Sequence, residues 1–196
     1  MQQINRRSFL AMTAGCIAGM SMGKTGLSDQ KKNNRLNFIL ITADDMNWDA
    51  PGCFGSRKSL DVTPNLDKLA SEGMIFSNAH ITCAVCMPSR QTLMTGRYPH
   101  RNGAMGFYPI WDHVPTLQEE LSKAGYLNGI LGKVNHNTPS EKYPWNLVYD
   151  FQDLCFGRDP SLYYKYSKEL FDRASAENKP FFLMANSHDP HRPFYG

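Results

Sequence analysis

Residues 36–45, LNFILITADD, form a continuous apolar run of strand length that ends abruptly in two carboxylates. An apolar run without polar alternation is expected of a β-strand covered on both faces, as in a parallel sheet. Two later runs, YLNGIL at 126–131 and PFFLMAN at 180–186, have the same character. The opening stretch therefore predicts a strand over residues 36–42 that is one of several buried parallel strands.

Helical patterns separate these runs. Thr63 and Pro64 look like an N-cap followed by proline at the first helical position, and Thr116 with Glu119 fits a capping box. The sequence predicts helices over 64–72, 88–95, 117–124 and 161–176, a short strand over 74–76 and a loop over 139–160. Strands that alternate with helices are typical of an α/β fold with a largely parallel sheet.

Polar residues follow each of the three apolar runs. They are Asp44–Asp45 after the first run, Lys133 with His136 after the second, and His188-Asp189-x-His191 after the third. Because α/β folds bind ligands beyond the carboxyl ends of their strands, these residues are expected to meet at one edge of the sheet. The three groups together indicate one shared site.

The adjacent carboxylates of Asp44 and Asp45 repel each other unless a positive charge lies between them. A hard divalent cation supplies that charge, because Ca²⁺ and Mg²⁺ prefer oxygen ligands. The alternative is a pair of loop aspartates that cap helices or carry surface charge. Both interpretations remain open on position alone.

The segment 83–96, CAVCMPSRQTLMTG, contains the spacing Cys83-x-x-Cys86. A zinc site would need a second cysteine pair, and a redox pair at a helix start does not require Arg90. If Pro88 begins a helix, the free N–H groups of its first turn form an anion site next to Cys86, with Arg90 one turn on. Cys86 is then a candidate nucleophile, and a buried structural cysteine is the alternative.

Lys133, His136 and His191 are the other candidates for chemistry. A lysine can hold an anionic substrate oxygen, and a histidine can act as an acid or as a hydrogen-bond donor to a leaving group. The alternative for each histidine is a surface residue or a core residue whose hydrogen bonds are satisfied.

Length and composition fit one globular domain or a large piece of one. The chain has 196 residues, 41% hydrophobic and 20% charged, with a net charge of +3. Several of the positive charges lie within the first 35 residues, so the sequence shows no basic stripe of the kind that binds nucleic acid.

The N-terminus is similar to a bacterial twin-arginine export signal. Arg6 and Arg7 precede a weakly apolar run that is too short, and too rich in Gly, Ala and Ser, to form a transmembrane span. We assign residues 1–30 to the signal and linker and residues 31–196 to the folded part, which predicts a periplasmic or cell-surface location. Cys16 is a candidate site of lipoprotein acylation. Without the leader four cysteines remain, which allows two disulfides but does not require them.

Taken together, these motifs resemble those of the type I sulfatases, the formylglycine-dependent enzymes of the alkaline-phosphatase-like superfamily. The resemblance covers residues 36–196 and rests on ITADD, TPNLDKLASEG, CMPSRQTLMTG, LGKVNH and FFLMANSHDPHRPF, in family order. The closing HDPHRPF is most similar to the heparan N-sulfatase (sulfamidase) branch, and the GKVNH spacing also resembles the iduronate-2-sulfatases. The resemblance implies hydrolysis of sulfate esters or sulfamates, on sulfated glycans.

It also implies a role for each matching residue. Cys86 would be oxidised by a formylglycine-generating maturase, and the hydrated aldehyde would attack sulfur. Asp44 and Asp45 would bind Ca²⁺, or alternatively Mg²⁺, together with residue 86. The remaining implied roles are Arg90 stabilising the hydrated formylglycine, Lys133 and His191 contacting the sulfate, and His136 near the nucleophile or the leaving group.

Three features depart from the family pattern. Met87 is larger than the usual residue after the cysteine, and two residues rather than one separate Lys133 from His136. Family members continue well beyond the position of Gly196, with further metal ligands and a smaller C-terminal domain. The resemblance therefore implies the N-terminal part of a sulfatase. The alternatives are an inactive fragment that binds sulfated glycan, and a phosphatase or phosphodiesterase of the same superfamily, which would usually carry Ser or Thr as nucleophile.

Overall fold

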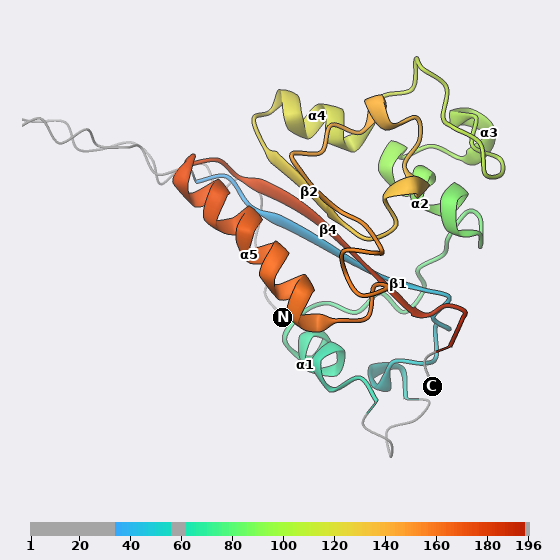
Figure 1. Ribbon diagram of the computed structural model, residues 1–196. Coiled ribbons are helices and arrows are strands. Elements are labelled where there is room, and N and C mark those ends of the chain that lie inside the picture. Colours follow the sequence, from blue (N-terminus) through green and yellow to red (C-terminus); the bar gives the residue numbers. More distant parts are fainter. Residues whose placement is uncertain (1–33, 56–61, 195–196) are drawn as a thin grey trace, which may run out of the picture. The chain divides into compact units, whose positions relative to one another are not determined.

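The computed structural model describes residues 34–55 and 62–194. The predicted export signal and Cys16 lie outside the described residues. A four-stranded sheet has the order β1-β4-β2-β3, with every neighbouring pair parallel (Figure 1). The strands are β1 (Phe38–Asp44), β2 (Leu127–Leu131), β3 (Leu147–Tyr149) and β4 (Phe181–Pro190). The predicted α/β fold with a mostly parallel sheet is confirmed.

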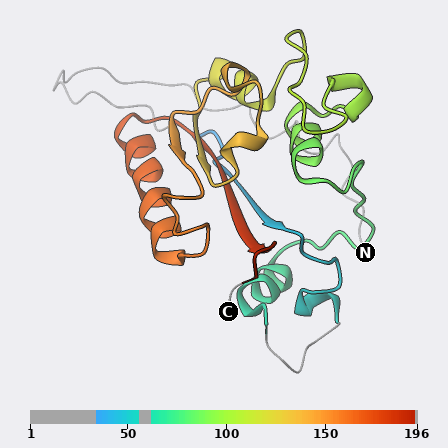
Figure 2. The ribbon, with the colours of Figure 1, turned by 45° about the vertical axis from the view of Figure 1, so that its right-hand side comes forward.

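Helices cover both faces of the sheet (Figure 2). The α-helices are α1 (Pro64–Glu72), α2 (Cys86–Thr95), α3 (Pro99–Asn102), α4 (Leu117–Lys123) and α5 (Pro160–Ala176). Short 3₁₀ turns are η1 (Gly52–Phe54), η3 (Val134–His136) and η4 (Ser140–Lys142). None of the helices in the described residues combines the length and the apolar character that a bilayer-spanning helix needs.

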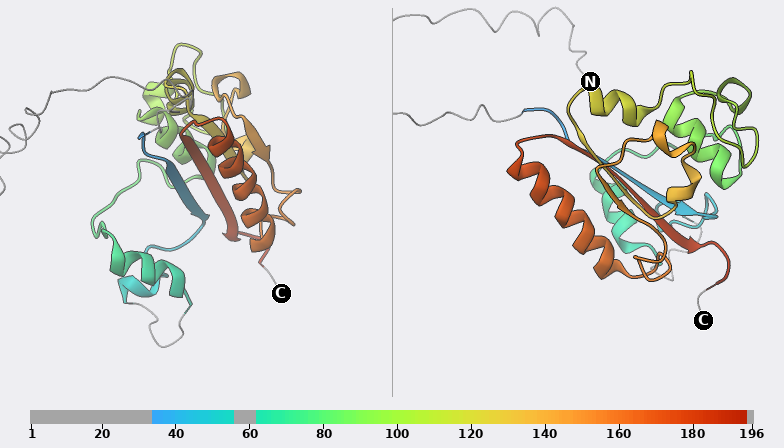
Figure 3. Two further views of the ribbon diagram at one scale, coloured as in Figure 1. Left: turned by 90° about the vertical axis from the view of Figure 1, so that its left-hand side faces the viewer. Right: turned by 45° about the horizontal axis from the view of Figure 1, so that its top comes forward.

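Two apolar clusters lie on opposite faces of the sheet. Met184 of β4 packs in the cluster that includes Met94 of α2, whereas the next residue back, Leu183, packs in the cluster that includes Leu170 of α5. This division follows from the alternation of side chains along a strand. Both views of Figure 3 show α5 along one face and the segments around α2 and α4 on the other.

Local sequence signals explain where the helices begin. At α4, Thr116 Oγ1 accepts from Glu119 N at 3.2 Å, and Glu119 Oε2 accepts from Thr116 N at 2.9 Å, so the predicted capping box is confirmed. The Asp159 side chain accepts from Ser161 N at 2.8 Å and caps α5, which has Pro160 at its first position.

Four sequence predictions were wrong in detail. Residues 74–76 form no strand, because they are exposed and pair with none of the described strands. The predicted loop 139–160 contains β3, which is only three residues long and gives no periodic signal. The third apolar strand continues past 186 to Pro190. Helix α2 begins at Cys86 rather than Pro88, since the turn hydrogen bond from Ser89 N reaches back to Val85 O.

Strand β1 is also less covered than predicted. Within the described sheet it lies at one edge, and Ile39 and Ile41 are 53% and 65% exposed. The reason is that α5 packs against β4 and β2, so the same face of β1 has no helix of the described residues directly over it.

Close packing of α5 on β2 makes Gly129 sensitive to substitution. A Cβ at Gly129 would lie 2.7 Å from Leu170 Cδ2. We expect Gly129→Ala to lower the free energy of unfolding by about 1–3 kcal/mol, the usual cost of overpacking. Urea denaturation followed by circular dichroism measures it. In a Leu170→Ala background the same change should cost little or stabilise, because the new methyl group fills the vacated space; an equal cost in both backgrounds would contradict this account.

Candidate functional site

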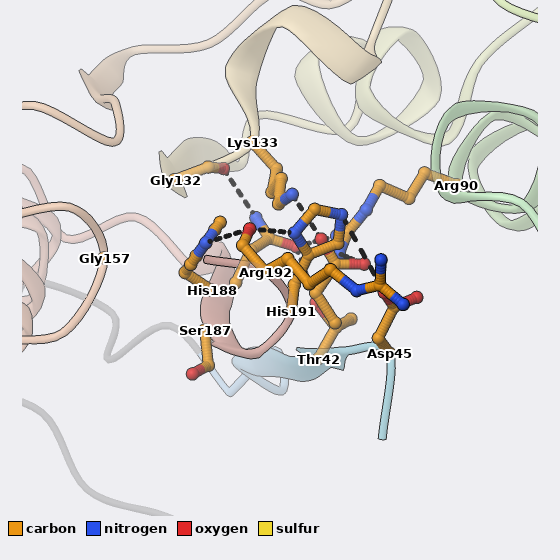
Figure 4. Close-up of polar contacts among 12 residues, drawn as sticks. Thr42, Asp45, Arg90, Gly132, Lys133, Gly157, Ser187, His188, His191 and Arg192 are labelled. Atoms are coloured by element: carbon orange, nitrogen blue, oxygen red, sulfur yellow. Dashed lines mark hydrogen bonds and ion pairs between the residues drawn. The ribbon is translucent and has the colours of Figure 1, made fainter. Parts of the chain in front are cut away.

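The predicted site residues from three strand ends lie together (Figure 4). Asp44 is the last residue of β1 and pairs with Pro190 of β4, after a register shift between Thr42 and Asp44. Lys133 follows β2 directly after Gly132, and His191 follows β4. The parallel sheet therefore brings residues that are far apart in sequence to one edge, as its topology requires.

Two cations flank the buried carboxylate of Asp44. Arg90 Nη2 lies 3.8 Å from Asp44 Oδ1, and Lys133 Nζ contacts Asp44 Oδ2. Burial by itself raises the pKa of Asp44, but the hydrogen bond and charge of Lys133, followed by the charge of Arg90, outweigh it and hold the pKa below its usual value. Asp44 is therefore ionised at neutral pH.

Cys86 is the first residue of α2 and lines a cleft of about 260 Å³ together with Asp44, Asp45 and Arg90. Burial, and next the negative charge of Asp44, raise the pKa of its thiol. A protonated thiol is a weak nucleophile, so this environment does not activate Cys86 as a thiolate. The site gives a cysteine-based redox mechanism no electrostatic support.

The same cleft offers donors to a cation. A carboxylate oxygen of Asp44, the sulfur of Cys86 and a ring nitrogen of His191 all lie within 4.8 Å of one another. Their spacing fits a single ion, but three donors are fewer than the roughly six to eight that Ca²⁺ takes. Asp45 lies beside this group and is exposed, with its Oδ2 at 3.8 Å from His191 Nε2.

His136 lies in a different pocket from Cys86. It lines a space of about 170 Å³ with Lys133, Asp150 and His188. Burial, and then the charges of Lys133 and Arg90, lower the pKa of His136 to about 4. The structure thus gives a neutral imidazole that lines one pocket with Lys133, whereas Cys86 lines another.

Cys83 and Cys86, the C-x-x-C pair of residues 83–96, form no disulfide in the structure. The four cysteines of the described residues, Cys53, Cys83, Cys86 and Cys155, are free. Of these, Cys86 alone belongs to the group of candidate metal donors found in the described part of the chain. Cys83 contributes nothing to that group, so the donors do not support the zinc interpretation.

Sequence reasoning missed two polar residues at the centre of the site. Asn186, 1% exposed, accepts hydrogen bonds from Thr42 Oγ1 at 2.7 Å and from Arg90 Nη1. Thr42 also accepts from Arg90 Nη1 at 3.0 Å. The available signal was that each residue stands near the end of an apolar run, where a buried polar side chain needs a partner.

Comparison with known proteins identifies the class. The Sulfatase family model matches residues 36–196, so the chain belongs to the sulfatase family. The chain is 33% identical over 174 residues to N-sulphoglucosamine sulphohydrolase of Homo sapiens, an alignment that covers 82% of this chain and 34% of the human protein. The predicted resemblance to sulfatases is confirmed.

Two solved structures are similar in fold. BT4656, in complex with its substrate D-glucosamine-2-N,6-O-disulfate, has a TM-score of 0.65 at 24% identity, covering 81% of this chain and 35% of that chain. BT1596, a 2-O GAG sulfatase, has a TM-score of 0.58 at 26% identity, covering 80% and 35%. At 24% identity, the similarity to BT4656 is evidence of a shared fold and of nothing more. The chain spans about a third of the length of these relatives.

The low pKa of His136 predicts a pH dependence of stability. The folded pKa is about 4, whereas an unfolded histidine titrates near 6.5. Between these values the unfolded chain binds the proton more readily, so the free energy of unfolding should fall as the pH drops from about 6.5 to about 4, with no contribution from His136 above that window.

Urea denaturation at several pH values tests this, together with an NMR titration of the His136 ring. The His136→Gln variant should show a shallower slope across the window. A slope unchanged by that substitution, or a ring that titrates near 6.5, would contradict the prediction.

Proposed function

We propose that the chain is the N-terminal part of an enzyme that hydrolyses sulfate esters or sulfamates, with residue 86 as nucleophile. The observation that carries the proposal is a cluster at the carboxyl ends of the strands. There Arg90, Lys133 and His191 lie around Asp44 and Cys86. A sulfate monoester carries negative charge that grows on the leaving group as the bond to sulfur breaks, and fixed cations stabilise such charge.

The proposal gives Cys86 its role only after modification. The raised pKa of the thiol makes it a poor nucleophile as a cysteine. Oxidised by a formylglycine-generating maturase and hydrated, residue 86 would carry two hydroxyl groups. One hydroxyl attacks sulfur and forms a sulfate ester on residue 86, while the bond from sulfur to the substrate oxygen or nitrogen breaks and the leaving group departs with a proton. The other hydroxyl then loses its proton, and the aldehyde re-forms as the C–O bond to sulfate breaks and sulfate leaves.

Arg90, which lines the cleft with residue 86, is proposed to stabilise the hydrated formylglycine, and Lys133 to hold a sulfate oxygen. His191 lies within 4.8 Å of the thiol and the carboxylate, so its ring nitrogen can donate to the sulfate oxygens. His136 belongs to the neighbouring pocket behind Lys133 and is proposed to face the leaving group, where a neutral imidazole can donate a hydrogen bond.

Asp44, Asp45 and residue 86 are proposed to hold Ca²⁺, or alternatively Mg²⁺. When bound, the cation would neutralise charge on the sulfate oxygens. The replacement of sulfur by hydroxyl oxygens at residue 86 would make the donors harder and suit such an ion better than the thiol does. The remaining ligands would come from the part of a sulfatase that this chain does not span.

A sulfated glycan is the proposed substrate. One relative is named for N-sulphoglucosamine and a structural neighbour is a 2-O GAG sulfatase, which supports this class. The Arg6–Arg7 segment supports export, and a twin-arginine route would carry the protein already folded and modified.

Maturation of residue 86 is the decisive prediction. After co-expression with a formylglycine-generating maturase, peptide mass spectrometry should show the peptide with residue 86 lighter by the difference between a thiol and an aldehyde side chain. Cys83→Ala should be modified like the unsubstituted chain, whereas Cys86→Ala should not. An unmodified Cys86 under these conditions would refute the proposed nucleophile.

Sulfate release from N-sulfoglucosamine and from an aryl sulfate is the second measurement. The measurement uses a modified protein as long as the relatives, which includes the part of a sulfatase that this chain does not span. This protein should release sulfate, and its Cys86→Ala variant should release none. Hydrolysis of a phosphate ester in place of both sulfated compounds would favour the phosphatase alternative.

A further inference from the structure

We infer that Asn186 is a positioning residue, whose buried carboxamide fixes Arg90 and the turn carrying Lys133 around residue 86. Asn186 lies in β4, between β1 and β2, and is 1% exposed. Its importance for catalysis rests on the proposed function, but the contacts that define it do not.

The carboxamide uses its full hydrogen-bonding capacity. Nδ2 donates to Leu131 O at 3.1 Å and to Gly132 O at 2.8 Å. Oδ1 accepts from Thr42 Oγ1 at 2.7 Å and from Arg90 Nη1. Two donors and two acceptor positions are all that an amide offers, so one side chain ties together β1, β2 and α2.

These partners fix which way the amide points. In the reverse orientation the NH₂ group would face the Arg90 guanidinium, and Oδ1 would face the carbonyls of Leu131 and Gly132. The contact with Arg90 would then pair a donor with a donor, and the contacts with the two carbonyls would pair an acceptor with an acceptor; only the Thr42 hydroxyl, which can donate or accept, would tolerate the change. The observed orientation is therefore the one that the surroundings permit.

Both ends of the amide act on charged residues of the site. On the Oδ1 side, Arg90 directs Nη1 to Asn186 and Thr42, which leaves Nη2 facing Asp44 at 3.8 Å. On the Nδ2 side, the anchored Gly132 carbonyl precedes Lys133, whose φ of 56° turns the chain so that its ammonium contacts Asp44. Asn186 thus couples the two cations.

Asn186 is a buried polar residue that directly follows an apolar run of β4. The preceding run Phe181–Ala185 is apolar, and a buried polar group costs free energy unless it is hydrogen-bonded. Asn128 supplies a matched comparison, because it is 0% exposed, lies in the neighbouring strand β2, and donates through Nδ2 to Gln118 O, Ser122 Oγ and Pro144 O. None of those partners is a site residue.

The test measures the electrostatic environment of the unmodified Cys86 thiol in the 196-residue chain. Alkylation rates at Cys86 are determined with anionic iodoacetate and with neutral iodoacetamide, and peptide mass spectrometry separates Cys86 from the other cysteines. The ratio of the two rates cancels differences in thiol ionisation. It reports how strongly Arg90 and Lys133 attract an anion at residue 86.

We expect Asn186→Ala to lower this ratio about fivefold, the factor that corresponds to roughly 1 kcal/mol of lost stabilisation of an anionic transition state. Asn128→Ala should lose comparable unfolding free energy and keep the ratio, and Arg90→Met sets the lower limit. An unchanged ratio in Asn186→Ala, or an equal fall in Asn128→Ala, would overturn the inference.

If Asn186→Ala does not fold, the Thr42→Val variant tests instead whether the network around Asn186 sets the ratio of alkylation rates. It removes one hydroxyl partner of Arg90 and Asn186 from an edge strand at nearly constant volume, so the ratio should fall by a smaller factor; an unchanged ratio would then overturn the inference. Failure of the proposed function has a different signature. The unsubstituted chain would form no aldehyde at residue 86, while its alkylation ratio would still depend on Asn186.

Discussion

The charge of the Asp44 carboxylate is the constraint on which the rest of the site depends. A buried carboxylate is costly unless cations or hydrogen-bond donors compensate it. Here Arg90 of α2 and Lys133 after β2 supply that compensation, and they keep the pKa of Asp44 low despite burial. Helix α2 and the β2 turn are thereby held against the end of β1, which places Cys86 in the same cleft.

The same arrangement explains why the cluster suits anion chemistry. Arg90 and Lys133 are held beside residue 86, and the carboxylates of Asp44 and Asp45 balance their charge, so the cleft suits a substrate anion bound together with a metal cation, as proposed. The thiol itself is suppressed, because burial and Asp44 raise its pKa. These two properties fit a sulfate-binding site whose nucleophile is made by modification of Cys86, and they fit a redox cysteine poorly.

Much of this could be predicted from the sequence, with specific exceptions. The apolar runs predicted β1, β2 and β4, and the residues after them predicted the site edge that the structure shows. Strand β3 was missed because it has only three residues, in a segment rich in proline and aromatic residues, and so short a strand shows no alternation of apolar and polar side chains. Asn186 was missed because its partners come from Arg90, Thr42 and the end of β2, which are distant in sequence. The chemical roles of all the candidate site residues stay predictions. Of these residues, Asp45 and His136 also lie outside the donor group that contains Cys86.

The sequence by itself determined the fold class and the family, and it predicted the candidate site residues, because hydrophobic periodicity and short motifs are local properties of the chain. Tertiary structure decided how those residues are charged and oriented. The ionisation of Asp44, the neutrality of His136 and the suppressed thiol of Cys86 all depend on burial and on neighbours from other elements. The orientation of Arg90 depends on an amide in another strand. Such effects arise only when the strands and helices pack together, since electrostatic and hydrogen-bond energies depend on distance and solvent exposure.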